Sequence, residues 1–168
     1  MVSGWLAGQS ETADRLNDNH ARTIDFTAIT ANSATSASTT ELVAITTPSI
    51  TFRNGRAFKV TFKGLATNTV ANDQIGVKVR KTNTTTTPIL LDSFRVNLGA
   101  AGTYLFYFRS VFINTSGADI STLLVGTFMR VTGGTGNINI TASVTSPAYL
   151  ETEDIGDSDD FLNAATLT

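Results

Sequence analysis

Hydrophobic and polar residues alternate with a period of two through most of this chain, beginning at Thr23. Residues 58–63 (FKVTFK) show the pattern most clearly, because apolar side chains alternate there with Lys59, Thr61 and Lys63. Successive side chains of a strand point to opposite faces, so such a segment has one dry face and one wet face. The pattern predicts an antiparallel sheet with one covered side.

Similar segments recur along the chain, separated by turn residues and without helical periods between them. The strands expected on this basis span residues 23–28, 42–45, 50–52, 58–63, 74–81, 89–96, 103–113, 120–131, 138–144 and 148–153. The strongest hairpin signal is Asn54-Gly55, since both residues tolerate the positive φ of a tight turn. Together these features predict an all-β fold, an antiparallel, jelly-roll-like β-sandwich.

One predicted strand, residues 103–113 (TYLFYFRSVFI), breaks the alternation because it is apolar on both faces. A strand of this kind needs a second cover. The cover is either another part of the chain, such as loops or the N-terminal arm, or a neighbouring copy, and we favour the copy because aromatic residues are enriched in interfaces. The candidate residues for the oligomer interface or the core are Tyr104, Leu105, Phe106, Tyr107, Phe108 and Phe112.

The two ends differ from this β-rich body. We expect three parts: an N-terminal anchoring arm (1–22), the sandwich domain (23–155) and a short, solvated acidic tail (156–168). The arm is polar, and its few apolar residues are too few for a core but suffice to lie in a groove on a partner. These partner-anchoring residues are Trp5, Leu6, Ala13 and Leu16.

The composition removes several classes of function. The net charge is −2, so the chain lacks the basic surface expected of a nucleic-acid-binding protein. No apolar run reaches the length needed to cross a bilayer, and residues 1–6 do not form a secretory signal. We therefore expect neither nucleic acid nor membrane as a partner.

Candidate catalytic or metal-binding chemistry is sparse. Cysteine is absent and His20, in the polar arm, is the only histidine. A His- or Cys-based metal site is therefore excluded by number. The acidic run from Glu151 to Asp160 offers oxygen atoms, but its spacing does not match an EF-hand loop. Paired carboxylates of the glycosidase type stay open, since any two acids can meet in space. We expect no enzyme activity and no cofactor.

Three motifs, in order along the chain, resemble a known family. Residues 4–9 (GWLAGQ) with 12–17 (TADRLN) are similar to an opening common in structural proteins of tailed phages. Residues 55–62 (GRAFKVTF) resemble a strand of small β-domains from phages of actinobacteria. Residues 147–156 (PAYLETEDIG) resemble the closing strand of those domains, with Thr152 where valine is usual.

The resemblance implies a virion structural protein with a jelly-roll-like, trimeric domain. It leaves the place in the virion open, because such domains occur on heads, tails and fibres. The short chain lacks coiled-coil heptads and collagen repeats, which favours a decoration protein on the capsid surface. Its expected partners are itself, as a homotrimer, and the major capsid protein or another virion protein. The alternative is a minor tail or fibre protein with a receptor- or carbohydrate-binding β-domain.

Overall fold

The computed structural model describes residues 20–82, 89–131 and 135–167, with only the backbone described for residues 89–98. Its strands are β1 (Arg22–Ile29), β2 (Leu42–Thr46), β3 (Ile50–Phe52), β4 (Arg56–Asn68), β5 (Asp73–Lys81), β6 (Ile89–Leu98), β7 (Gly102–Asn114), β8 (Ile120–Thr122), β9 (Leu124–Arg130), β10 (Ile138–Thr141), β11 (Ala148–Asp157) and β12 (Ala165–Thr166). A 3₁₀ turn, η1 (Ser158–Phe161), follows β11. No helix in these ranges is long and apolar enough to cross a membrane.

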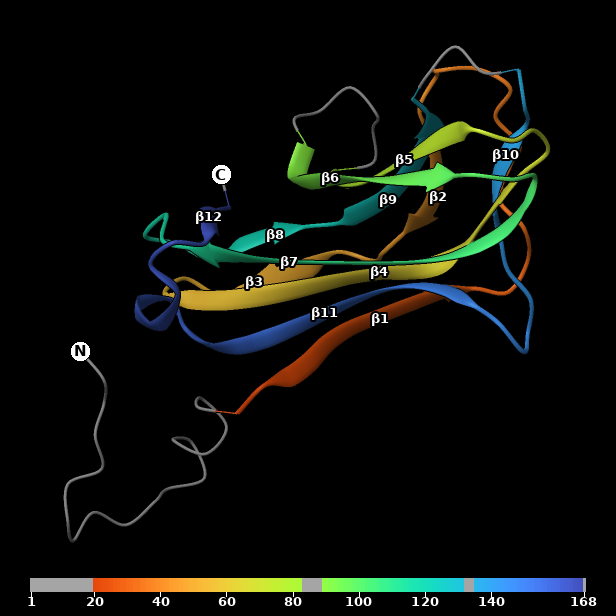
Figure 1. Cartoon of the computed structure of the whole chain (residues 1–168). Coiled ribbons are helices and arrows are strands. Elements are labelled where there is room, and N and C mark those ends of the chain that lie inside the picture. Colours follow the sequence, from red (N-terminus) through yellow and green to blue (C-terminus); the bar gives the residue numbers. More distant parts are fainter. Residues whose placement is uncertain (1–19, 83–88, 132–134, 168) are drawn as a thin grey trace, which may run out of the picture.

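The strands pair as one long antiparallel ribbon folded over on itself. Near the middle of the chain β5 pairs with β6, and outward from there β4 pairs with β7, β2 with β9, and β1 with β11. Folding this ribbon gives two facing sheets, ordered β1-β11-β4-β7 and β2-β9-β5-β6 (Figure 1). This double-sheet arrangement is a jelly roll. The predicted all-β, jelly-roll-like sandwich is confirmed.

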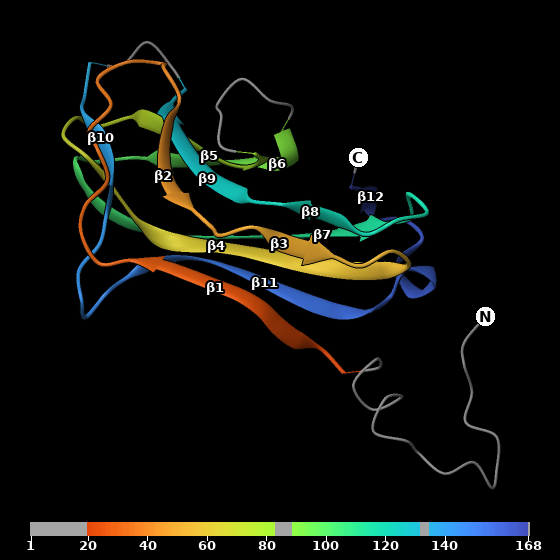
Figure 2. The same ribbon diagram turned by 180° about the vertical axis from the view of Figure 1, so that it is seen from behind.

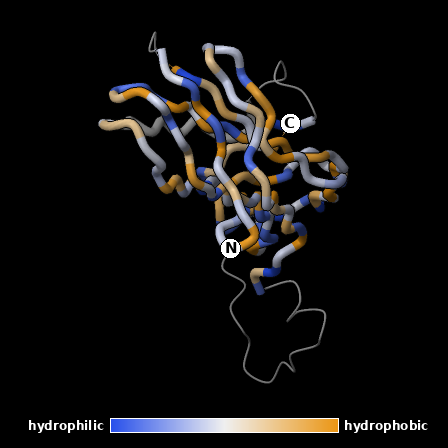
Figure 3. The backbone as a smooth tube through the Cα atoms, turned by 90° about the vertical axis from the view of Figure 1, so that its right-hand side faces the viewer, coloured by the Kyte–Doolittle hydropathy of each residue, from blue (hydrophilic) through white to orange (hydrophobic). Residues whose placement is uncertain are grey.

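The core lies between the inner faces of the two sheets. Phe58, Val60 and Phe62 of β4 are essentially inaccessible to solvent, as the alternation in residues 58–63 predicts. The rings of Phe62 and Phe106 meet edge to face with centroids 5.0 Å apart. Figure 3 shows the hydrophobic and hydrophilic positions alternating along the strands. Each fully buried phenylalanine contributes about 1.5–3 kcal/mol through removal of apolar surface from water.

Two glycines allow the core rings to approach the backbone. A Cβ at Gly64 would lie 2.9 Å from the Phe106 ring, and one at Gly126 would lie 2.9 Å from the Phe62 ring. Both distances are shorter than a van der Waals contact. These two positions therefore lack a side chain because an aromatic ring from the facing or neighbouring strand occupies that space.

The side chains of β1 that face the core are not those expected from simple alternation. The simple alternation places Ile24, Phe26 and Ala28 on one dry face. The structure has a bulge between Thr23 and Asp25, and Ile24 packs against the core while Phe26 and Ala28 are exposed. Because a one-residue bulge shifts the side-chain period by one position, the residues after it change faces.

The Asn54-Gly55 signal marks a turn but not a hairpin. Gly55 has a φ of +74°, as expected for a tight turn. The strands on either side do not pair with each other, since β3 pairs with β8 while β4 pairs with β7 and β11. The Asn54 side chain accepts a hydrogen bond from Gly117 N at 2.9 Å, which ties the turn to the β7–β8 connection.

Two other strands differ in their bounds from the sequence prediction. Residues 120–131, expected as one strand, form the two strands β8 and β9, and β11 continues past the expected end at Glu153 to Asp157.

The segment after β11 is folded onto the sheet. Asp157 at the end of β11, and Asp159 and Asp160 in η1, are exposed. However, β12 pairs in parallel with the end of β7, and Leu167 is fully buried in the core. The apolar residues of this segment, which the acidic composition obscures, attach it to the domain.

Candidate interaction surface

β7 has the two-sided character that its sequence predicts, and the two sides meet different surroundings. On the inner side Phe106 and Phe112 are buried and Phe108 is 8% exposed. Tyr104, near the start of the strand, is half-buried against the same core. On the outer side Leu105 is 62% exposed and Tyr107 is 49% exposed. Within the described part of the chain, the second cover that this strand needs is not supplied.

Neighbouring strands extend this outer surface. The strand register places Tyr149 of β11 beside Lys63 of β4, and Lys63 beside Tyr107 of β7. Phe26 of β1 stacks against Tyr149 with ring centroids 5.0 Å apart, and Phe26 itself is 56% exposed. We call the surface formed by Phe26, Lys63, Leu105, Tyr107 and Tyr149 the aromatic face. It crosses the whole sheet, from β1 at one margin to β7 at the other (Figure 2).

Cations are interspersed with these rings. Lys63 Nζ lies 5.7 Å from the centroid of the Tyr149 ring, and the Arg109 guanidinium lies 5.7 Å from that of Tyr107. Both distances suit a cation–π attraction. Burial, followed by the charge of Glu151 and the proximity of Tyr107, raises the pKa of Tyr149. Its phenol therefore stays neutral at physiological pH, and the neutral rings lie among charged side chains of both signs. Exposed aromatics and arginine are typical of protein interfaces.

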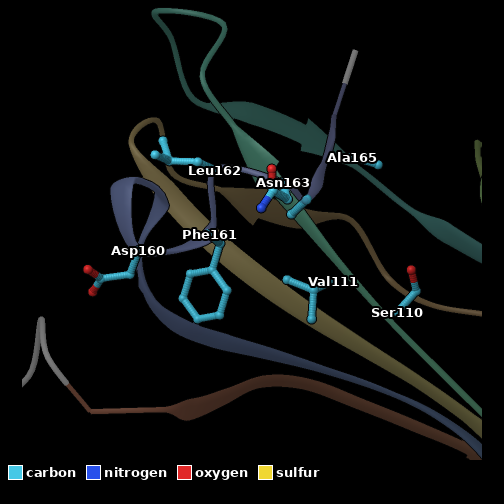
Figure 4. A pocket seen from close by; sticks show the side chains of 8 residues that line it. Ser110, Val111, Asp160, Phe161, Leu162, Asn163 and Ala165 are labelled. Atoms are coloured by element: carbon cyan, nitrogen blue, oxygen red, sulfur yellow. The ribbon is translucent and has the colours of Figure 1, made fainter.

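A hollow lies beside the C-terminal part of β7. It has a volume of about 510 Å³ and is lined by Ser110 and Val111 of β7 and by residues 160–165 (Figure 4). The residues from this last segment include Phe161 and Leu162, and Leu162 is 77% exposed. The lining mixes apolar side chains with three polar ones, Ser110, Asp160 and Asn163, and Asp160 is its single titratable side chain.

A polar cluster on the other sheet was not foreseen from the sequence. The carboxylate of Glu41 accepts hydrogen bonds from Arg80 (2.5 Å from Nε), Lys78 (3.0 Å) and Thr127 (2.5 Å). Burial alone would raise the pKa of Glu41, but these three donors outweigh it and lower the pKa to about 2. In the sequence, Lys78 and Arg80 lie two residues apart and so share one face of a strand, a spacing that does not by itself distinguish a solvated face from an ion-pair cluster. The cluster ties β2, β5 and β9 together.

The acidic run near the C-terminus is divided among separate partners. Asp154 is buried and forms a two-pronged ion pair with Arg56, at 2.7 Å from Nη2 and 3.0 Å from Nε. Glu153, on the opposite face of β11, pairs with Lys59 at 2.5 Å. Among the described residues no three His, Cys, Asp or Glu side chains lie together so as to hold a metal ion. The geometry assigns these two carboxylates to structural ion pairs.

The predicted anchoring residues Trp5, Leu6, Ala13 and Leu16 lie outside the described residues. His20 is the first described residue and is exposed. Of the predicted β7 residues, the structure brings Phe106, Phe108 and Phe112 into the core and leaves Leu105 and Tyr107 on the aromatic face. The structure adds Phe26 and Tyr149 to this surface. They lie far from Tyr107 in the sequence, and the strand order β1-β11-β4-β7 brings the three residues onto one face.

No family model and no curated protein sequence matches this chain. Similar solved structures include a chain of infectious bursal disease virus Gt strain, with 14% identity and a TM-score of 0.44. A chain of the Gx strain of that virus has 14% identity and a TM-score of 0.41. The matches cover 90% and 83% of this chain but only 41% and 36% of those chains. Both TM-scores lie below 0.5, so these likenesses identify neither a family nor a function.

Proposed function

We propose that this chain is a non-enzymatic structural protein of a virus particle, a trimeric decoration protein on the capsid of a tailed phage. The observation that carries the proposal is the aromatic face. Leu105 and Tyr107 stand exposed on a strand whose other side supplies Phe106, Phe108 and Phe112 to the core. Large apolar side chains gathered on one sheet face mark an interaction surface.

Two further features support this role. The jelly roll is an architecture that viral capsid domains use, although lectins use it as well. The three sequence motifs, at residues 4–17, 55–62 and 147–156, resemble those of phage structural proteins. The middle motif coincides with the start of β4, and the last coincides with most of β11. The motif residues therefore include two central strands of the sheet that carries the aromatic face.

The proposed action is to stabilise the assembled shell by binding to it. Copies associate through the aromatic face, and the N-terminal arm (residues 1–22) docks on the major capsid protein or another virion protein. Contacts that form only with the assembled shell stabilise it by mass action. Because three arms act together, even weak individual docking gives tight binding to the particle surface.

Deletion of residues 1–20 tests the docking role. The deleted residues precede β1, so the truncated protein should keep its melting temperature and its oligomeric mass. It should no longer co-sediment with virus particles stripped of this protein, whereas the full chain should. Normal decoration by the truncated protein would show that the arm is not the anchor.

A second candidate is a minor tail or fibre protein whose β-domain binds a receptor or a carbohydrate. The exposed Tyr107 ring beside Arg109 favours it, because sugars stack on aromatic rings and bond to charged side chains. Screening the full chain on a glycan array separates the two candidates. Specific glycan binding that is lost in Tyr107→Ala supports the second candidate, and its absence supports the first.

A further inference from the structure

The second edge of β7 is open over most of its length. On one side β7 pairs with β4 from Gly102 to Asn114 without a register shift. On the other side its partner in the described chain is β12, which pairs only with Phe112 and Ile113. Figure 1 shows β12 at one end of β7. Residues 103–111 therefore form a strand edge that lacks a neighbouring strand within the described residues.

The direction of the peptide groups along this edge follows from one hydrogen bond. Leu167 N donates to Ile113 O at 2.7 Å, so the carbonyl of Ile113 points toward the open side. Because β7 has no bulge, alternate residues point their N–H and C=O groups the same way. The residues whose backbone groups face the open edge are thus Thr103, Leu105, Tyr107, Arg109 and Val111. An uncovered edge of this kind is a template for another strand.

The opposite margin of the same sheet has the matching properties. β1 (Arg22–Ile29) pairs only with β11 in the described chain, and its eight residues are one fewer than those of segment 103–111. Each neighbouring pair in β1-β11-β4-β7 is antiparallel. β1 and β7 therefore run in opposite directions. If β1 of one copy is laid along β7 of the next, the antiparallel order of the sheet continues.

The side chains at the two margins also match. Phe26 on β1 is 56% exposed and Leu105 on β7 is 62% exposed, both on the aromatic face. Pairing the margins would place Phe26 of one copy beside Leu105 and Tyr107 of the next. It would cover three of the exposed large apolar side chains and satisfy the edge peptide groups in the same contact.

We propose that β1 of a second copy adds to β7 along residues 103–111, so that the sheet runs on from one subunit into the next. This inference rests on the proposed self-association and specifies its contact. The contact is head to tail, because β1 and β7 are different surfaces, and such contacts build a ring when the rotation closes. The C-terminal segment sets one limit of the contact, since β12 already occupies the edge at Phe112 and Ile113.

Cysteine cross-linking tests this contact, and the absence of native cysteine makes the result easy to read. The single variants Phe26→Cys and Tyr107→Cys are treated, separately and as a mixture, with a short bis-maleimide that reaches from one residue to its directly opposed and diagonal neighbours on the adjacent strand. The mixture should give a covalent dimer, and each single variant alone should not. Efficient cross-linking of Tyr107→Cys to itself would overturn the proposal in favour of a β7–β7 contact.

Proline at an edge position gives an independent test. The Arg109 N–H faces the open edge, so Arg109→Pro removes no bond within its own sheet, whereas Ser110→Pro removes one to β4. Arg109→Pro should fold yet sediment as a monomer, Ser110→Pro should lose stability, and Arg109→Ala, which retains the N–H, should remain an oligomer. Sheet structure by circular dichroism verifies that Arg109→Pro is folded, and Tyr107→Lys replaces it if it is not.

The two proposals fail in distinguishable ways. A wild-type chain that sediments as a monomer overturns the self-association itself. An oligomer in which Phe26→Cys and Tyr107→Cys do not cross-link, or one that survives Arg109→Pro, overturns only the edge contact.

Discussion

At the scale of single residues, Thr152 differs from the other buried hydroxyl-bearing residues that the structure describes. It is fully buried on β11, between Val60 of β4 and Asp25 of β1, and its hydroxyl has no hydrogen-bond partner among the described residues. A buried hydroxyl without a partner costs about 1–3 kcal/mol. The same position carries valine in the motif that this strand resembles, and valine has the same shape without the hydroxyl.

We predict that Thr152→Val stabilises the fold by about 1 kcal/mol, because it removes that desolvation cost. Urea denaturation measures the change. Thr127→Val is the matched control: the Thr127 hydroxyl donates to Glu41, so its loss should destabilise the protein. A Thr152→Val variant less stable than the wild type would contradict the account of this site.

At the scale of elements, the Glu41 cluster joins three strands of the sheet opposite the aromatic face. Its lowered pKa, about 2 against an ordinary 4.5, means that the carboxylate is more stable in the folded state than in the unfolded chain. A group with a lowered folded pKa stabilises above its unfolded pKa, and this contribution is lost as the pH falls through the folded value.

We therefore expect the melting temperature to fall between pH 4.5 and pH 2 in part through Glu41. In Glu41→Gln the protein should be less stable at pH 7, and this part of the decline toward pH 2 should be absent. Thermal melts of both proteins across that range measure the difference. Parallel pH curves for the two would show that Glu41 makes no differential contribution.

The inner side of β7 contributes to the stability of the fold and the outer side does not, and mutation can distinguish the two. Phe106 is buried against Phe62 and Gly64, so Phe106→Ala should lower the free energy of unfolding by about 3–5 kcal/mol. Leu105→Ser on the exposed side should leave that free energy nearly unchanged. Chemical denaturation at a low protein concentration, where self-association is weak, isolates this effect. Equal losses in the two variants would contradict the assignment of faces.

The sequence predicted the strands well, because their existence depends on local alternation. Residues 58–63 form the centre of β4, and residues 103–113 are inside β7 almost to the residue. The prediction of which β1 side chains face the core was wrong, because one bulge beside Thr23 moves each later side chain of the strand to the opposite face. The Asn54-Gly55 hairpin was also wrong, because the turn chemistry is local whereas the choice of partner strand is not.

The candidate surface could be predicted only in part for the same reason. The exposed pair Leu105 and Tyr107 follows from one strand that is apolar on both faces. Phe26 and Tyr149 join that pair only through the order β1-β11-β4-β7, which connects residues distant in sequence. The Glu41 cluster likewise needs β2, β9 and β5 to be neighbours.

At the scale of the whole molecule, the jelly roll divides the hydrophobic residues into two groups. One group fills the space between the sheets. The other, the aromatic face, lies on the outside of one sheet, beside the β7 edge that has no neighbouring strand among the described residues. A domain of this construction has a core of its own and still presents an apolar surface, which is the property that the proposed assembly of copies requires.

Sedimentation equilibrium of the full chain tests this claim most directly, in parallel with the double variant Leu105→Ser/Tyr107→Ser. Val144→Ser is the control, because Val144 is 83% exposed but lies in the β10–β11 loop and not on β7. The wild type and the control should have the mass of a trimer, and the double variant should be a folded monomer. A wild-type chain that is monomeric at every concentration, or a double variant that remains trimeric, would contradict the account.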